Sequence, residues 1–295
     1  MPSGTKEIQR RIRSVTNTKK ITKAMELVSA AKMRRAVQAV LATRQYARTA
    51  WNIVQDLAAK TDPEQHQLLQ TREKIQRIGL IVIASNRGLC GGFNRELVET
   101  AGNYASAQGV PVDVILMGKK GSTIQRQGHT IVADFEKLDV AESVRDVQAM
   151  ARLVITDYLD GKYDKIAIAY TDYKSAIKQT PRISQLLPIV KEDTELGQTQ
   201  GAAEIETKQE FEYMFEPSPA AVLNAMLYRL TELQVYQALL ESNASEHSAR
   251  MFSMRNASDA ATDMIKDLTL TFNQARQQSI TSELAEISAS RAAIT

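Results

Sequence analysis

A glycine-rich stretch near the middle of the chain has the residue types of an anion-binding loop. Residues 85–94 read SNRGLCGGFN and follow the apolar run IGLIVIA at residues 78–84. A run with helical character, RELVETAGNYASA, comes next at residues 95–107. A strand, a glycine-rich turn and a helix in this order form the plan of a phosphate-binding loop, in which backbone N–H groups approach an anion. The stretch therefore raises the question of whether the chain binds a nucleotide.

The spacing of the glycines argues against a nucleotide. A Walker loop needs four residues between its glycines and then Lys-Ser or Lys-Thr, whereas Phe93 and Asn94 stand at those last two positions. A dinucleotide loop needs a second glycine two residues after the first, and Cys90 occupies that position after Gly88. The nearby GKKGS at residues 118–122 fits neither pattern. We therefore interpret SNRGLCGGFN as a structural or contact loop, with anion binding as the alternative.

Other chemistry-bearing residues are sparse. The three histidines, His66, His129 and His247, have no ligand-like spacing, so no metal site is expected. Cys90 is the only cysteine, which excludes an internal disulfide and favours a reducing compartment. No apolar run approaches 18 residues, so no segment is expected to span a membrane. No cofactor is expected.

Two long helices are predicted at the ends of the chain, with an α/β region between them. Residues 4–59 contain no proline, and residues 220–288 contain neither glycine nor proline. Between them, strand-like runs alternate with helical patterns, which indicates βαβ units and a mainly parallel sheet. The expected strands are 78–84, 112–117 and 165–170, and the expected helices are near 95–107 and 143–160. Residues 191–210 are polar and are expected to form a loop or an exposed edge strand.

Apolar residues recur along both long helices at spacings of three and four, which predicts that each buries a stripe. The first helix shows this pattern at Ile8, Ile12, Val15, Ile21, Met25 and Val28. The last helix shows it at Leu223, Met226, Leu230 and Leu233, and again at Met254, Ala257, Ala261, Ile265, Leu268, Phe272 and Ala275. A coiled-coil seam needs a partner, and each helix is the obvious partner of the other.

The second seam is interrupted. Gln237 stands where an apolar residue is due, and small and polar residues dominate 242–262. We expect this stretch to form a surface that can move past other subunits without binding them permanently.

Charge is distributed unevenly. Residues 1–60 carry 13 Lys/Arg and 3 Asp/Glu, a net of +10, against +3 for the whole chain. Such a basic arm predicts an acidic partner: nucleic acid, anionic lipid or an acidic protein surface.

Three segments resemble a known family. KEIQRRIRSVTNTKKITKAMELVSAAKMRRA at residues 6–36, the loop SNRGLCGGFN, and SEHSARMFSMRNASDAATDMIKDLTLTFNQARQQSITSELAEI at residues 245–287 are similar to the gamma subunit of F-type ATP synthases. The resemblance implies an α/β fold with a long coiled coil: the terminal helices form an antiparallel shaft, and a Rossmann-like α/β domain is inserted between them. It implies a division into 1–62, 75–210 and 217–295, and a pairing of residue 8 with 284 and of residue 28 with 265.

The resemblance also implies a function. The chain would be the rotor of the central stalk, coupling proton flow to ATP synthesis or hydrolysis on the beta subunits and regulating ATPase activity, with no catalytic residue of its own. Its partners would be three alpha and three beta subunits, the epsilon subunit and the membrane c ring, with no nucleic acid and no small-molecule substrate. It would be a peripheral protein on the cytoplasmic face of a bacterial inner membrane.

Residue roles follow from the same resemblance. The residues expected to contact the ring of alpha and beta subunits are Lys19, Lys20, Lys23, Met25, Lys32, Arg34, Arg35, Cys90, Arg250, Arg276 and Gln277. Gly88, Gly91 and Gly92 are expected to allow a tight turn. The alternative for the basic arm is a coiled-coil protein that binds nucleic acid, although no base-reading module accompanies it.

The failed loop spacings predict that the purified chain does not bind ATP at micromolar concentration. Calorimetric titration of the chain with Mg-ATP should give no saturable heat, because the loop lacks the lysine and hydroxyl of a Walker site. A saturable isotherm in the micromolar range would show that the loop binds an anion after all.

Overall fold

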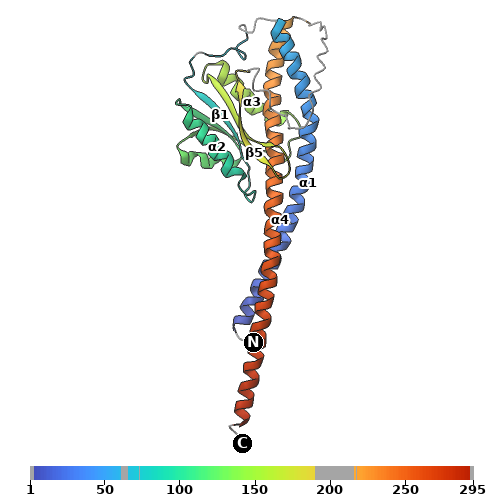
Figure 1. Ribbon diagram of the computed structural model, residues 1–295. Coiled ribbons are helices and arrows are strands. Elements are labelled where there is room, and N and C mark those ends of the chain that lie inside the picture. Colours follow the sequence, from blue (N-terminus) through green and yellow to red (C-terminus); the bar gives the residue numbers. More distant parts are fainter. Residues whose placement is uncertain (1–2, 61–65, 73, 190–215, 217, 293–295) are drawn as a thin grey trace. The chain divides into compact units, whose positions relative to one another are not determined.

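The computed structural model describes residues 3–60, 66–72, 74–189, 216 and 218–292 (Figure 1). These residues form two compact units, which are described separately below. Unit 1 joins residues 1–29 to residues 250–295, and unit 2 comprises residues 30–249. Two helices, α1 and α4, continue from one unit into the other.

The elements follow one another as helix, α/β region and helix. In chain order they are α1 (Ser3–Lys60), β1 (Ile78–Ile83), α2 (Phe93–Ala107), β2 (Val112–Met117), the 3-10 helix η2 (Lys119–Gln127), β3 (Thr130–Phe135), α3 (Arg145–Leu159), β4 (Lys165–Tyr173), β5 (Gln179–Leu187) and α4 (Pro219–Ala292). The start of α4 has a local cause. Ser218 precedes it, and its Oγ accepts a hydrogen bond from the N–H of Ala221 at 3.3 Å, as an N-cap does. Pro219 then takes the first helical position, where no N–H is needed.

Unit 2 contains a five-stranded sheet of order β3-β2-β1-β4-β5. All pairs are parallel except β4 with β5. The central strand β1 is buried along its whole length because both faces are covered. Ile81 and Ile83 pack on the side of α3 and α4, whereas Leu80 and Val82 pack on the side of α2. This alternation follows the two-residue period of a strand.

The expected sheet and helices are confirmed, but three elements were not predicted. The edge strand β3 is only half-buried, with Val132 43% exposed, although four of its six residues are apolar. The other edge strand, β5, contains Pro181 and polar residues. The 3-10 helix η2 covers most of GKKGS, where no element was predicted. The segment 191–210 lies outside the described residues.

Unit 1 is an antiparallel pair of helix segments. Thr22 Oγ1 lies 2.7 Å from Ser258 Oγ, and Arg255 Nε donates to Glu26 Oε1 at 3.2 Å. Later residues of α1 therefore lie opposite earlier residues of α4. The antiparallel direction is confirmed, but the expected pairings of residue 28 with 265 and of residue 8 with 284 are both wrong by more than three helical turns.

The seam of α1 in unit 1 also differs from the apolar stripe that the sequence suggests. Ile21 and Val28 are 60% and 57% exposed, so the prediction that they are buried is wrong. Thr22, Glu26 and Ser29 are buried instead. These polar positions continue the three-four spacing of Ile8, Ile12, Val15 and Lys19, which are half-buried. On α4 the expected seam holds: Met254 and Ala261 are buried, and Ala257, Ile265, Leu268, Phe272 and Ala275 are half-buried. On α1, the position of a residue on the helix therefore decides whether it is buried against α4, and its hydrophobicity does not.

The register can be tested with cysteine pairs in a Cys90→Ser background. Thr22→Cys with Ser258→Cys should form a disulfide under mild oxidation, because the two side-chain oxygens lie within the reach of a disulfide. Val28→Cys with Ile265→Cys is the matched control and should not. Non-reducing electrophoresis after proteolysis reports both. Efficient closure of the control pair, with no closure of the first, would contradict the register.

Candidate functional site

The loop after β1 is held by its own side chains. The Ser85 N–H donates to Asn94 Oδ1 at 3.0 Å, and Asn94 Nδ2 donates back to Ser85 Oγ at 2.7 Å. The Ser85 hydroxyl donates to the carbonyl of Arg87 at 2.7 Å. Asn94 Nδ2 also lies 3.2 Å from Cys90 Sγ, and this thiol is buried. The polar side chains of Ser85 and Asn94 are therefore hydrogen-bonded within the loop.

Two residues of this loop have a left-handed backbone. Gly91 has φ +59, as expected of a residue that permits a tight turn, whereas Gly92 has φ −79 and precedes α2 as its N-cap. Leu89 has φ +64, which is uncommon for a residue with a Cβ, and its side chain is 62% exposed. Leu89 therefore holds an exposed apolar side chain in a strained turn.

The second glycine motif has a packing role. Gly118 follows β2 with φ +100, and a Cβ at this position would collide with the carbonyl oxygen of Ala84. The backbone N–H of Lys120 donates to the carbonyl of Ser85 at 2.9 Å. GKKGS thus lets the ends of β1 and β2 approach each other closely.

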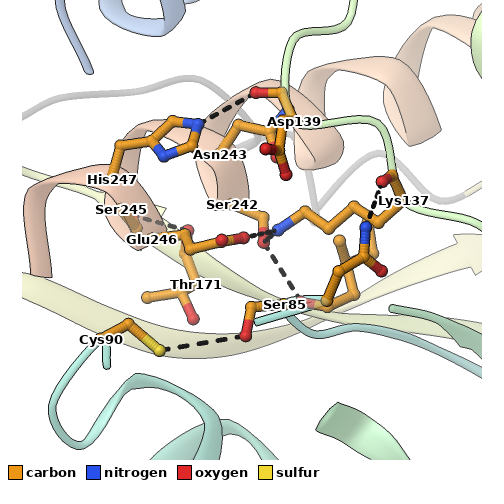
Figure 2. A network of polar contacts seen from close by, with 12 residues as sticks. Ser85, Cys90, Lys137, Asp139, Thr171, Ser242, Asn243, Ser245, Glu246 and His247 are labelled. Atoms are coloured by element: carbon orange, nitrogen blue, oxygen red, sulfur yellow. Dashed lines mark hydrogen bonds and ion pairs between the residues drawn. The ribbon is translucent and has the colours of Figure 1, made fainter. Parts of the chain in front are cut away.

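The carboxyl ends of β1 and β4 mark the point where ligands bind in many α/β sheets. The strands that follow β1 in sequence, β2 and β3, lie on one side of it, and β4 lies on the other. Such a reversal of strand order opens a crevice outside the carboxyl ends of the strands, between β1 and β4. Here, α4 occupies that position (Figure 2). Ser242 Oγ donates to the carbonyl of Ile83 in β1, and Ser245 Oγ donates to the carbonyl of Thr171 in β4, both at 3.1 Å.

A buried ion pair adds to this contact. Lys137 Nζ lies 2.7 Å from Glu246 Oε2, and the two side chains are 1% and 3% exposed. The same ammonium donates to Ser242 Oγ at 3.1 Å and lies 5.5 Å from the centre of the Phe93 ring. Loss of one partner of such a pair generally costs about 3–5 kcal/mol, because the other charge stays buried and uncompensated.

Lys137 belongs to a three-residue segment that we call the connector, residues 137–139. The carbonyl of Leu138 accepts from Asn243 Nδ2 at 3.1 Å, and the carbonyl of Asp139 lies 2.9 Å from His247 Nε2. The Asp139 carboxylate binds Lys32 of α1 at 2.7 Å. Burial raises the pKa of Asp139, but the hydrogen bond and charge of Lys32 outweigh burial, so this pKa lies below its ordinary value. The connector therefore binds both long helices.

These contacts overturn the expectation for the first part of the polar stretch 242–262 of α4. The whole stretch is expected to form a surface facing other subunits, yet residues 242–248 are all buried within this chain, whereas Arg255, Asn256, Asp259 and Ala260 are exposed. Gln237, which interrupts the seam, is also buried and accepts a hydrogen bond from Thr43 Oγ1 at 2.7 Å. The sequence did indicate that this stretch is special. Small and polar residues stand in a helix without glycine or proline, at positions where the seam calls for apolar residues. The partner Lys137 gave no signal, because it lies 109 positions from Glu246.

The residues expected to contact the ring lie in both units. Of those in unit 1, Lys20, Lys23, Arg276 and Gln277 are exposed, Lys19 and Met25 are half-buried, and Arg250 is 8% exposed. Of those in unit 2, Arg34 and Arg35 are exposed, Lys32 is half-buried and bound to Asp139, and Cys90 is buried. Gly91 is exposed, and Gly88 and Gly92 are half-buried. Their roles stay predictions.

Glu26 is a residue of unit 1 that the sequence analysis missed. Its carboxylate is buried and binds Lys23 Nζ at 2.9 Å and Arg255 Nε at 3.2 Å. The hydrogen bond from Lys23 lowers the pKa of Glu26 below the ordinary 4.5; burial opposes this effect, and the charges of Lys23 and Arg255 reinforce it. This carboxylate joins α1 to α4 at a seam position.

No group of three or more His, Cys, Asp or Glu side chains in the described part of the chain could hold a metal ion. Among the described helices, none has the length and apolar character needed to cross a membrane.

Comparisons with known proteins agree on one family. The family profile described as ATP synthase matches residues 4–294. The ATP synthase gamma chain of Chloroflexus aurantiacus is 41% identical over the full length of both chains, and that of Moorella thermoacetica is 41% identical over 96% of each. The chain belongs to the ATP synthase gamma-chain family.

Solved structures share the fold. A chain of the Euglena gracilis mitochondrial ATP synthase aligns with a TM-score of 0.69 at 23% identity, covering 99% of this chain and 94% of that one. A chain from the central stalk and c ring of the Tetrahymena thermophila mitochondrial ATP synthase aligns with a TM-score of 0.60 at 24% identity, covering 81% and 99%. The expected fold, with a coiled coil and an inserted α/β domain, is therefore confirmed.

The lowered pKa of Glu26 predicts how acid affects unit 1. In the unfolded chain Glu26 titrates near 4.5, and in the folded chain it titrates lower, so its contribution to stability is complete above pH 4.5. That contribution should be lost as the pH falls below 4.5 and through the folded pKa. Glu26→Gln should lower the melting temperature at pH 7 and reduce this acid-dependent loss, as followed by circular dichroism.

Asp263→Asn is the matched control, because Asp263 pairs with Lys266 on the exposed surface of the same unit at 3.2 Å. Such exposed pairs contribute little to stability, so its melting temperature should follow that of the parent chain at every pH. Identical pH profiles for Glu26→Gln and the parent chain would show that Glu26 does not stabilise the helix pair.

Proposed function

We propose that this chain is the rotor of the central stalk of an F-type ATP synthase. In this role the paired terminal helices turn inside a ring of three alpha and three beta subunits. The α/β domain contacts the epsilon subunit and the membrane c ring. Proton flow turns the c ring and this chain together, which couples transport to ATP synthesis or hydrolysis and regulates the ATPase. We also propose the division of the chain into residues 1–62, 75–210 and 217–295.

The observation that supports this proposal most directly is the exposure of apolar residues on α1 in unit 1, next to buried polar positions of the same helix. A helix pair that serves only its own stability buries its apolar residues in the seam. In unit 1, α1 buries Thr22, Glu26 and Ser29 and exposes Ile21, Leu27 and Val28 by 57–61%. Exposed apolar residues gathered on a helix face are typical of a surface that meets a protein partner.

The end of α4 has the same character. Residues 281–290 are exposed all round, and Leu284 and Ile287 are 60% and 66% exposed. A helix end with apolar residues on its surface fits a sleeve formed by other subunits. The exposed cations Lys20 and Lys23 of α1 fit acidic partner surfaces, although each screened pair contributes only ~0–1 kcal/mol.

Unequal faces explain how a shaft could direct catalysis without catalytic residues. A partner subunit shifts between conformations only if its contacts differ between those conformations. The exposed apolar residues of α1, its exposed cations Lys20 and Lys23, and the exposed end of α4 offer different contacts to three identical neighbours. Rotation would then present each face to each beta subunit in turn. ATP would be made and hydrolysed on the beta subunits.

We place the chain as a peripheral protein on the cytoplasmic face of a bacterial inner membrane, attached through the c ring. Support comes from the bacterial sources of the relatives reported above. The nucleic-acid alternative has no support, because those relatives are named ATP synthase gamma chains.

The proposal predicts that a covalent tether to one beta subunit stops steady-state turnover. In a Cys90→Ser background, Val28→Cys offers an exposed thiol, and a second cysteine is placed in the facing beta loop. Oxidation should reduce ATP hydrolysis by the crosslinked fraction, and reduction should restore it. Single-site nucleotide binding should persist, since no nucleotide site is altered.

Thr22→Cys is the matched control, because Thr22 is 8% exposed and faces α4. It should neither crosslink to the beta subunit nor lose activity on oxidation. Full crosslinking through residue 28 with unchanged turnover would show that the shaft does not need to turn at that level.

A further inference from the structure

The contacts between the connector and α4 have an unusual chemical character. Helices in a protein core usually pack through apolar side chains, which adapt to small rotations because dispersion and burial have little directionality. Around residues 242–247 of α4, every side chain except the buried Ala244 makes hydrogen bonds, and Glu246 also forms an ion pair. Hydrogen bonds weaken steeply away from linear geometry. Contacts of this kind select one rotational setting of a helix.

The contacts lie on consecutive turns of α4. Lys137 binds Ser242 and Glu246, which are four residues apart on one helix face. Leu138 and Asp139 bind Asn243 and His247 through their carbonyls, one position further along the helix. A rotation of α4 by one residue would break both sets together, and so would a shift along its axis.

The connector is itself fixed to the rest of unit 2. Asn86 Nδ2, in the loop after β1, donates to the carbonyl of Lys137 at 2.6 Å. The Lys137 ammonium faces the ring of Phe93, the first residue of α2. Asp139 binds Lys32 of α1. The connector is therefore a point where the sheet, the loop SNRGLCGGFN and both long helices meet.

From this arrangement we infer that Lys137, with the carbonyls of Leu138 and Asp139, sets the rotational position of α4 on the α/β domain. Lys137 is a positioning residue, which acts on the shaft through Glu246 and Ser242. On the proposed function, on which this consequence rests, the connector passes torque from the α/β domain to α4.

Distances between spin labels can test the rotational position. In a full-length Cys90→Ser chain, labels on Glu99→Cys in α2 and Ala225→Cys in α4 both occupy exposed positions of unit 2. A rotation of α4 by one residue, about 100°, moves a side chain at a radius of ~5 Å by roughly 8 Å. Pulsed electron resonance resolves a shift of that size. The parent chain should give one narrow distance distribution.

Lys137→Met should broaden this distribution about twofold or add a second peak, because the directional contacts with Glu246 and Ser242 are lost. Lys162→Met is the matched control. Lys162 forms an ion pair of the same 2.7 Å length with Asp157 of α3 rather than with a residue of α4, so its loss should leave the distribution unchanged.

The outcomes separate cleanly. A folded Lys137→Met chain with the distribution of the parent overturns the inference, and so does equal broadening in Lys162→Met. If Lys137→Met does not fold, the double variant Ser242→Ala with Asn243→Ala decides by the same criterion, since it removes hydrogen bonds without leaving a buried charge unpaired.

The torque consequence needs the assembled complex. Single-molecule recordings of the paused shaft should show a wider angular distribution with Lys137→Met than with Lys162→Met. A complex of the parent chain that does not rotate would refute the proposed function and leave the distance result standing. Rotation with equal angular widths in the two variants, despite broadened distances in Lys137→Met, would show that torque takes another route.

Discussion

Unit 2 depends on one constraint, the burial of the polar residues 242–248 of α4 against the carboxyl ends of β1 and β4. A helix with serine, asparagine, glutamate and histidine side chains can enter a core only if most of its polar groups find partners. The carbonyls of Ile83, Thr171, Leu138 and Asp139 and the ammonium of Lys137 supply most of them, and among the described residues Asn243 Oδ1 is left without one. The polar side chains of α4 therefore constrain the structure around them. This structure comprises the ends of β1 and β4, the loop after β1 and the connector.

The loop SNRGLCGGFN is best understood from this constraint. Its plan is that of a phosphate loop, yet its serine and asparagine bind each other and its cysteine is buried. Across the crevice, where a phosphate-binding protein would hold its ligand, α4 places Ser242 and Glu246. The architecture of a nucleotide-binding fold thus serves here to hold a helix.

Elements that depend on local pattern were predictable from the sequence. The buried strands β1, β2 and β4 are mostly apolar runs, and long stretches without glycine or proline, residues 5–60 and 220–288, mark α1 and α4. The contacts that define the candidate site were not predictable, because Lys137 and Glu246 meet only through the tertiary fold. The seam of α1 was misread at Ile21 and Val28 for a related reason: hydrophobicity marks residues that bury apolar surface somewhere, including surfaces meant for partners.

The occupied crevice also limits how this domain could change over evolutionary time. Sheets of this topology gain or lose ligands readily when their crevice is filled by loops or solvent, since a few substitutions reshape such a pocket. Here the occupant is a continuous helix shared by both units of the chain. Any substitution that made room for a ligand would first have to release α4 from Ile83, Thr171 and Lys137. The domain is therefore expected to diverge at its edges, along β3 and β5, while its ligand-binding position stays closed.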